Sequence, residues 1–376
     1  MMKNHRFWRL PAYFLIVGLC PLLGVWLAQK PVSPYLTFPP IPTPSQPEPF
    51  SWAAFLLIGV FVIACLSPFL VKIIGTKMPS GNKPRETRDF SRWGWFGMIF
   101  LAFFWIIAWT RFPLFEAIQR FTFAPLWIGY IWIVNALTFR KSGHCCLLDR
   151  TTYFLWLFPL SAVFWWSFEY LNRFVSNWYY IGVSDLGPWE YFIHCSLPFS
   201  TVLPAVISTS EYLKTFPRLS NGLDKFPLLH LSGQTFWAWS LISISAISFT
   251  ALALWPEHLF FLVWLAPIAL ICDLQLLTEL PPLLKDIITG DWRRVWRLAL
   301  AGLICGFFWE MWNINSLAHW KYNVPYVQHF MLFEMPLIGY AGYFPFGIVC
   351  GLFADFIMLN KTPSEEFSGI TGNPEQ

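Results

Sequence analysis

Residues able to carry acid-base chemistry occur twice in this 376-residue chain, in the same order and at nearly the same spacing. Each copy contains a glutamate, an asparagine, a tryptophan, a tyrosine and a second glutamate: Glu169, Asn172, Trp178, Tyr180 and Glu190 in the first, and Glu310, Asn313, Trp320, Tyr322 and Glu334 in the second. Equivalent residues lie 141 to 144 positions apart. The repeated pattern predicts an internal duplication that gathers carboxyl, amide and aromatic groups in each half.

The composition indicates where these carboxyl groups lie. Hydrophobic residues make up 56% of the chain and charged residues 12%, which is about half the charged share of a typical soluble domain. We therefore expect an all-α fold, a polytopic membrane helix bundle with about ten transmembrane helices. Because an ionisable side chain is costly inside a bilayer, the repeated glutamates are candidates for function.

Ten segments are long and apolar enough, or nearly so, to cross a bilayer as helices. They are residues 11–28, 52–74, 95–110, 122–139, 153–171, 189–208, 235–255, 257–277, 298–315 and 330–359. The last segment is interrupted by prolines and glycines, so we expect a kink or a break in it.

Lysine and arginine set the predicted orientation. With the N-terminus inside, 20 of them fall on the cytoplasmic side and 5 on the other, which predicts a multi-pass protein with both termini cytoplasmic and the repeated motif at the outer ends of its helices. The basic residues are spread over every inner loop, so no nucleic-acid partner is expected. No small-residue cleavage pattern follows the first apolar run, which we interpret as an uncleaved anchor.

Changes in composition divide the chain into six parts. Residues 1–74 form a two-helix leader with a proline-rich outer loop, for which an extended, polyproline-type connection is expected at 31–49. The other parts are a basic cytoplasmic linker at 75–94, a membrane repeat at 95–208, a cytoplasmic linker at 209–234, a second repeat at 235–360 and a disordered tail at 361–376. Four helices in each repeat predict parallel repeats related by an axis near the membrane normal.

The polar residues of each motif copy have a plain structural alternative. Glu169 and Asn172 are three residues apart and therefore share a helix face, and the same holds for Glu310 and Asn313. Arg173 is placed to pair with Glu169. Glu190 and Glu334 are expected to open the next helix. The plain alternative is that each carboxylate there serves as a helix cap and has no further role.

The aromatic residues are open to two interpretations. The chain contains 23 tryptophans, and tryptophan and tyrosine collect at both membrane interfaces as anchors. The alternative is an aromatic wall around an apolar ligand or a cationic intermediate. The residues placed for that wall are Trp178, Tyr180, Trp320 and Tyr322, with Trp165, Trp166, Trp309 and Trp312 beside the helix glutamates.

Metal and cofactor motifs are not expected. Adjacent cysteines without a second spaced pair are a weak zinc signal, and the remaining histidines do not repeat between the halves. The residues concerned are His144, Cys145, Cys146, His194, His319 and His329. We predict no metal site and no cofactor, and we do not expect disulfides to organise the fold.

The order of motif elements resembles the integral-membrane lycopene cyclases of the heterodimer type. In that family an acidic helix residue precedes a Trp-x-Tyr or Trp-x-Phe element and then a Pro-x-Glu-Glu element. Here Glu169 precedes Trp178-Tyr179-Tyr180 and Pro188-Trp189-Glu190, whereas Glu310 precedes Trp320-Lys321-Tyr322 and Phe333-Glu334-Met335-Pro336. The resemblance covers roughly residues 95–360. The chain departs from the family because neither later glutamate is doubled and the second proline follows its glutamate.

The resemblance implies an intramolecular lyase or isomerase of isoprenoid or carotenoid-like lipid metabolism. Cyclising a polyene end needs a proton donor, a stabilised cation and a proton acceptor. A glutamate in hydrocarbon can stay protonated and act as the donor, so Glu169 or Glu310 would be the acid. Glu190 or Glu334 would be the anionic partner, and the substrate would lie against Asn172, Asn313, Trp166, Trp309 and the Trp-x-Tyr elements.

The partners expected on this hypothesis are the lipid bilayer and an apolar lipid or polyene substrate, and a second membrane subunit is left open. Two other classes remain open from the sequence. Parallel repeats and a glycine- and proline-interrupted last span also occur in membrane transporters. A non-catalytic protein that binds a lipid or a subunit would use the glutamates only as hydrogen-bonding groups.

Overall fold

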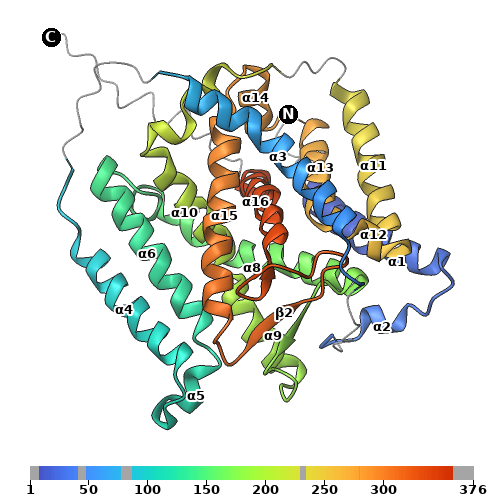
Figure 1. Ribbon diagram of the computed structural model, residues 1–376, viewed down its shortest axis with the longest axis horizontal. Coiled ribbons are helices and arrows are strands. Elements are labelled where there is room, and N and C mark those ends of the chain that lie inside the picture. Colours follow the sequence, from blue (N-terminus) through green and yellow to red (C-terminus); the bar gives the residue numbers. More distant parts are fainter. Residues whose placement is uncertain (1–7, 41–47, 78–86, 229–233, 279, 359–376) are drawn as a thin grey trace.

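The protein is a bundle of helices in which strands occupy only a few residues (Figure 1). The computed structural model describes residues 8–40, 48–77, 87–228, 234–278 and 280–358. Within them, eight helical segments are long and apolar enough to cross a membrane. The predicted fold class, an all-α polytopic membrane helix bundle, is confirmed. The cytoplasmic placement of the termini stays a prediction, and the tail at 361–376 lies outside the described residues.

Among the residues that the structure describes, eleven helices of twelve residues or more form the bundle. They are α1 (Arg9–Leu27), α3 (Trp52–Gly75), α4 (Arg92–Trp109), α6 (Phe123–Ser142), α8 (Thr151–Val175), α9 (Pro188–Phe199), α10 (Val202–Lys214), α11 (Gln234–Leu254), α13 (Leu262–Leu276), α15 (Arg293–Asn313) and α16 (Tyr343–Met358).

Short helices and strands connect them. The short helices are α2 (Ser33–Leu36), η1 (Pro113–Phe115), α5 (Glu116–Gln119), α7 (Cys146–Asp149), η2 (Pro217–Ser220), η3 (Leu223–Lys225), α12 (Pro256–Leu259), α14 (Pro282–Ile288) and η4 (Leu337–Gly342). The strands are β1 (Trp178–Ile181), β2 (His319–Tyr322), β3 (Met331–Leu332) and β4 (Met335–Pro336).

All ten segments predicted to span the membrane contain helix, but two of them are not long and apolar enough to span it by themselves. Residues Phe123–Ser142 meet the criteria of length and hydropathy only together with Pro113–Gln119, from which they are bent by 81°. The helix α13 has 15 residues, fewer than the roughly 20 that a bilayer core needs. The structure therefore supports eight spans, or nine with the bent pair, where the sequence predicted ten.

The last predicted span is broken, as expected, and its first part is not helical. Strands β3 and β4 form an antiparallel hairpin, η4 follows, and α16 begins only at Tyr343. Pro336 has no backbone N–H to continue a helix, and Phe330 and Phe333 adopt positive φ angles of 54° and 57°. Glu334 therefore lies in a hairpin turn, and the prediction that it opens a helix is wrong.

The proline-rich loop also differs from the prediction in part. Residues Ser33–Leu36 form a helical turn, with a proline among its first residues, where the missing N–H of proline has no partner to lose. An extended connection is therefore wrong for this stretch. Residues 41–47, which include further prolines, lie outside the described residues.

Helices α15 and α16 touch backbone to backbone at two glycines. A Cβ atom placed on Gly347 would collide with the carbonyl oxygen of Leu298, and one on Gly302 would collide with the carbonyl oxygen of Tyr343. Small residues allow this close approach between membrane helices. The contact fixes α16, and with it Tyr343, against the helix that carries Glu310.

We expect Gly347→Ala to destabilise the fold by about 1 to 3 kcal/mol, because the added methyl group overpacks the contact between the two helices. The measurement is the thermal unfolding midpoint of the purified protein in detergent. Gly18→Ala is the matched control, since a Cβ there has no neighbour within 4 Å. Equal midpoints for the two variants would contradict the contact.

Candidate functional site

The two Trp-x-Tyr elements form one antiparallel ribbon. Strands β1 and β2 pair so that Trp178 lies opposite Tyr322 and Tyr180 lies opposite Trp320. Alternate residues of a strand share a face, so these four aromatic side chains lie on the same side of the ribbon. Each tryptophan of one repeat thus faces the tyrosine of the other, which relates the two copies by a local two-fold axis through the ribbon.

The two asparagines hold the ribbon in equivalent ways. The amide nitrogen of Asn172 donates to the carbonyl of Trp178 (2.7 Å), and its oxygen accepts from the backbone N–H groups of Asn177 (2.9 Å) and Trp178 (3.3 Å). Asn313 donates to the carbonyl of Trp320 (2.7 Å) and accepts from its N–H (2.8 Å). The repeated asparagine therefore links the end of a spanning helix to the strand that follows.

Asn172→Ala is expected to lower the free energy of unfolding by about 1 to 3 kcal/mol, because it leaves buried backbone groups without partners. Asn313→Ala should have an effect of similar size. Both are measured as unfolding midpoints in detergent. The control is Asn315→Ala, since the Asn315 residue is exposed. A loss as large for Asn315→Ala would show that the bonds to the ribbon are not the cause.

Glu169 is buried and accepts three hydrogen bonds from aromatic donors. The indole N–H groups of Trp165 (2.9 Å) and Trp178 (3.0 Å) and the hydroxyl of Tyr180 (2.6 Å) all donate to Oε1. The expected ion pair with Arg173 is absent: its guanidinium donates to the carbonyls of Tyr35 (2.9 Å) and Thr37 (2.7 Å). The guanidinium thus bonds to two carbonyls, one within α2 at Tyr35 and one just after it at Thr37, in place of the Glu169 carboxyl group.

Glu310 is fully buried and has two hydroxyl partners. Tyr322 (2.7 Å) and Tyr343 (2.5 Å) donate to its Oε1, and its Oε2 has no hydrogen-bond partner within the described residues. The indole of Trp320 donates to the Tyr322 hydroxyl (2.8 Å) and not to the carboxyl group. The two equivalent glutamates thus have different environments, with three direct donors at one and two at the other.

One exchange of residues explains much of this difference. Four residues before its glutamate, α8 has Trp165, which donates to Glu169, whereas α15 has Gly306. A Cβ atom on Gly306 would overlap the ring of Tyr343. Without a side chain at 306, the Tyr343 ring can lie against α15. Its hydroxyl then donates to Glu310, as the indole of Trp165 donates to Glu169 in the first repeat.

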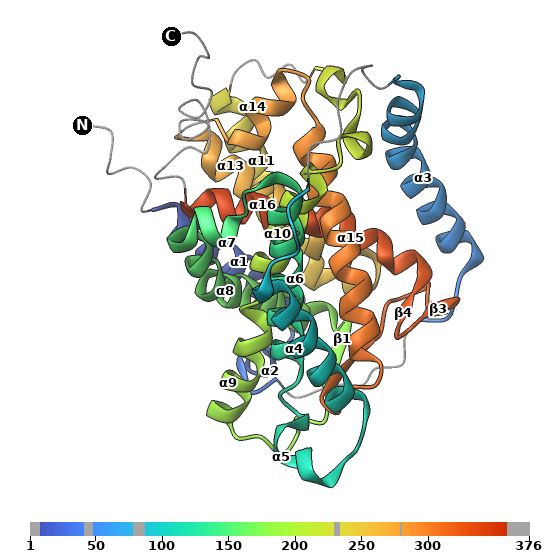
Figure 2. The ribbon, with the colours of Figure 1, turned by 90° about the vertical axis from the view of Figure 1, so that its left-hand side faces the viewer.

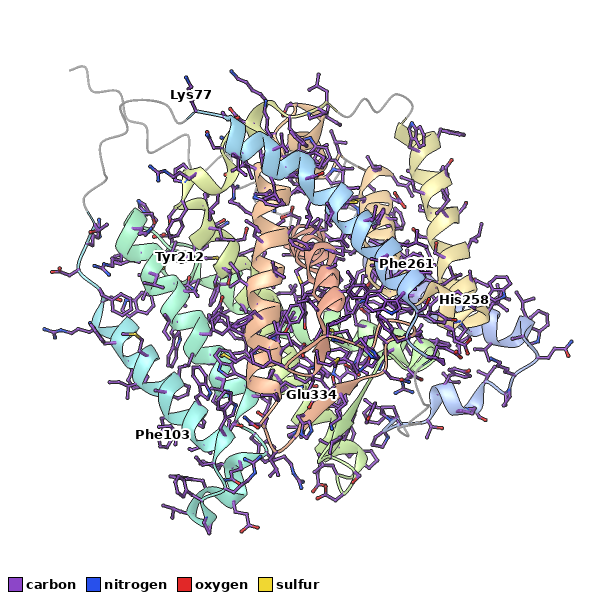
Figure 3. The ribbon with its side chains drawn as sticks, viewed as in Figure 1. Lys77, Phe103, Tyr212, His258, Phe261 and Glu334 are labelled. Atoms are coloured by element: carbon purple, nitrogen blue, oxygen red, sulfur yellow. The ribbon has the colours of Figure 1, made fainter. Side chains whose placement is uncertain are left out.

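Beside the ribbon is a large apolar cavity of about 1020 Å³. One wall is α3, which crosses α15 and α16 obliquely (Figures 1 and 2) and has no buried residue. It touches α15 through Phe69, whose ring stacks on that of Trp296 with centroids 5.2 Å apart. The other walls come from α9, the α12–α13 region, α15 and α16, and include His258 and Phe261 (Figure 3). The apolar lining and the exposed wall helix suit a lipid-like molecule.

The carboxyl groups lie behind this cavity and their donors line it. The lining residues include Trp165, Trp178, Tyr180, Tyr322 and Tyr343, all of which donate to one of the glutamates, but neither Glu169 nor Glu310 itself. Burial, together with the nearby glutamate, raises the pKa of Tyr180 and that of Tyr322 well above 10. Both hydroxyl groups on the ribbon therefore stay protonated donors at physiological pH.

The later glutamates do not join the site. Glu190 is exposed and accepts a hydrogen bond from the backbone N–H of Gly187 (3.0 Å), so it caps α9. Glu334 is half-buried in the β3–β4 turn (Figure 3). Trp166 donates to Ser196 (3.0 Å) and does not line the cavity, whereas Trp309 does. The capping alternative thus describes Glu190.

Tyr343 is the functional candidate that the sequence pattern missed. Its equivalent in the first repeat is Phe199, which has no hydroxyl group, and Tyr343 follows the hairpin that was predicted as helix. The available signal was the small residue Gly306, one turn before Glu310 on α15. Within the described residues, no group of three or more histidine, cysteine, aspartate or glutamate side chains is arranged to hold a metal ion.

The fold and the site together define a polytopic α-helical membrane protein with a lipid-sized cavity, whose wall carries aromatic donors backed by two buried carboxyl groups. Comparison of the chain with protein-family models, with curated proteins and with solved structures found no match.

Proposed function

We propose that the protein is a membrane enzyme that performs acid-base chemistry on an elongated apolar lipid of the isoprenoid or polyene type. The observation that carries the proposal is the pairing of an apolar cavity with hydroxyl and indole groups that hydrogen-bond to buried carboxyl groups. A structural wall for lipid alone has no need of a carboxyl group, which is costly to bury.

The two glutamates suit opposite roles. Glu310 in its neutral form is the proton source: its carboxyl proton occupies the 2.5 Å bond to the Tyr343 oxygen, so that the Tyr343 hydroxyl turns to the substrate. Tyr343 then delivers its own proton to a carbon-carbon double bond and takes up the proton of Glu310. Glu169, with three donors on one oxygen, is the anionic partner, because hydrogen bonds to a carboxylate stabilise its charge. This assignment replaces Glu190 and Glu334, which the sequence suggested as anionic partners.

The steps balance without a redox change. Protonation of the double bond leaves a tertiary cation, which the faces of Trp165, Trp178 and Trp309 along the cavity can stabilise. Attack by a second double bond of the same molecule closes a ring. The neighbouring carbon then loses a proton to the Tyr180 oxygen, whose own proton goes to Glu169. The product is an isomer of the substrate.

A second candidate is a lipid-binding protein without catalysis. It is favoured by the position of both carboxyl groups behind the cavity wall, where their hydrogen bonds also hold the ribbon in place. On this alternative the glutamates stabilise the fold around a bound lipid and transfer no proton.

Mass spectrometry of lipid extracts tests the proposal without a guess about the substrate. Cells with and without the gene, supplied with linear polyenes, are compared, and a product isomeric with a consumed lipid supports an enzyme. Unchanged extracts together with a lipid that co-purifies with the protein would favour the binding protein. Proton-coupled uptake of a solute into vesicles would favour a transporter and count against both.

A further inference from the structure

Polar side chains line one corner of the cavity. Arg120 and Phe121, which follow α5, and His194 on α9 all contribute to the lining. The ring of His194 packs edge-on against Phe121, with centroids 5.1 Å apart. The corner lies near the end of the ribbon, since the neighbouring lining residues include Val183 and His319.

His194 is a buried polar group that lacks a partner. The residue is 9% exposed, and its Nδ1 has no hydrogen-bond partner within the described residues. Buried polar groups are almost always hydrogen-bonded, because leaving such a bond unmade is costly. Because Nδ1 is enclosed by the protein, a ligand in the cavity would bond to the other ring nitrogen, Nε2, to which the described residues also offer no hydrogen bond.

Arg120 adds positive charge to the same corner. Its Nη1 pairs with Asp185 Oδ2 at 3.0 Å, and this hydrogen bond holds the pKa of Asp185 below its usual value. The Asp185 carboxylate is therefore ionised at neutral pH and holds the guanidinium beside the cavity. A guanidinium has five N–H donors, so one bond to Asp185 leaves others for a second oxygen.

We infer that the corner formed by Arg120, Phe121 and His194 binds the oxygen-bearing end of an isoprenoid lipid whose chain lies in the cavity. The oxygen belongs to a terminal hydroxyl or a phosphate, both of which an imidazole and a guanidinium can bind. The inference rests on the proposed function only for the isoprenoid nature of the chain. It implies that the ligand is bound in one orientation, with its polar end at α9.

The test is binding of three radiolabelled probes to the purified protein in detergent: geranylgeraniol, geranylgeranyl phosphate and squalene, which has no oxygen. His194→Phe keeps an aromatic ring against Phe121 but loses the nitrogen atoms. It should weaken binding of geranylgeraniol roughly two- to tenfold, as expected for one hydrogen bond, and leave squalene unchanged. His194→Gln should restore part of the loss.

Two comparisons make the result decisive. His258→Phe changes an exposed histidine that also lines the cavity, and it should affect no probe. Arg120→Gln should weaken geranylgeranyl phosphate more than geranylgeraniol if the head is a phosphate, and both alike if it is a hydroxyl. Equal losses for squalene and the oxygenated probes in His194→Phe would overturn the inference, as would no loss for either oxygenated probe.

Binding separates this inference from the proposed chemistry. The same probes are measured on Glu310→Gln, which retains the corner. If the proposed chemistry is wrong, His194→Phe still weakens binding of the oxygenated probes and not of squalene. If the head-group site is wrong, that selectivity is lost, but any isomeric product is still formed. If His194→Phe does not accumulate in membranes, Arg120→Gln with geranylgeranyl phosphate and squalene decides the question alone.

Discussion

Replacing Glu310 by glutamine is expected to lower the rate of product formation by about a hundredfold to ten-thousandfold, the range that a general acid contributes. Glutamine has nearly the same size and still offers an oxygen to the Tyr322 and Tyr343 hydroxyls, which donate to Glu310 at 2.7 and 2.5 Å. It has no carboxyl proton to pass on. The fold should therefore persist while proton delivery stops.

The measurement is the amount of isomerised lipid in extracts, normalised to the protein present in the membrane. Glu190→Gln is the matched control, because Glu190 is an exposed cap of α9, and its product profile should stay within about twofold of wild type. An unchanged profile for Glu310→Gln would end the proposal that this carboxyl group supplies the proton. A similar fall in both variants would point to protein loss.

Much of the site could be predicted because its interacting residues are close to one another in the sequence. Glu169 and Asn172 share one face of a helix, and the strand that they contact begins within ten residues, so the contacts to Trp178 and Tyr180 are short-range. The same holds for Glu310 with Asn313 and Tyr322. Apolar runs likewise placed helices at all ten predicted segments, since spanning a bilayer is a requirement of length and hydropathy.

The missed features depend on contacts between distant segments. The pairing of β1 with β2 joins residues about 140 positions apart, and no local pattern fixes its register. Glu334 was predicted to open a helix, but the positive φ angles before the hairpin, at Phe330, and in its turn, at Phe333, are tertiary features. The cavity lies between α3 and the helices α15 and α16, and hydropathy says nothing about how closely an apolar helix packs.

Gly306→Ala should lower product formation by up to about a hundredfold, although residue 306 has no polar atom in its side chain. A Cβ there would overlap three ring carbons of Tyr343, so the ring must move and its hydroxyl must leave the position 2.5 Å from Glu310. A shift of about 1 Å in a reacting group can cost a hundredfold in rate. The assay is the same normalised isomer yield.

A double-mutant cycle distinguishes this cause from general damage. In a Tyr343→Ala background the ring is gone, so adding Gly306→Ala should cost little more, because residues that act through one contact are not additive. Gly18→Ala, with no neighbour within 4 Å of its Cβ, controls for the added methyl group. Additive losses would mean that Gly306 serves helix packing alone. Non-additive losses would mean that glycine at position 306, where the first repeat has Trp165, serves to let the Tyr343 hydroxyl reach Glu310.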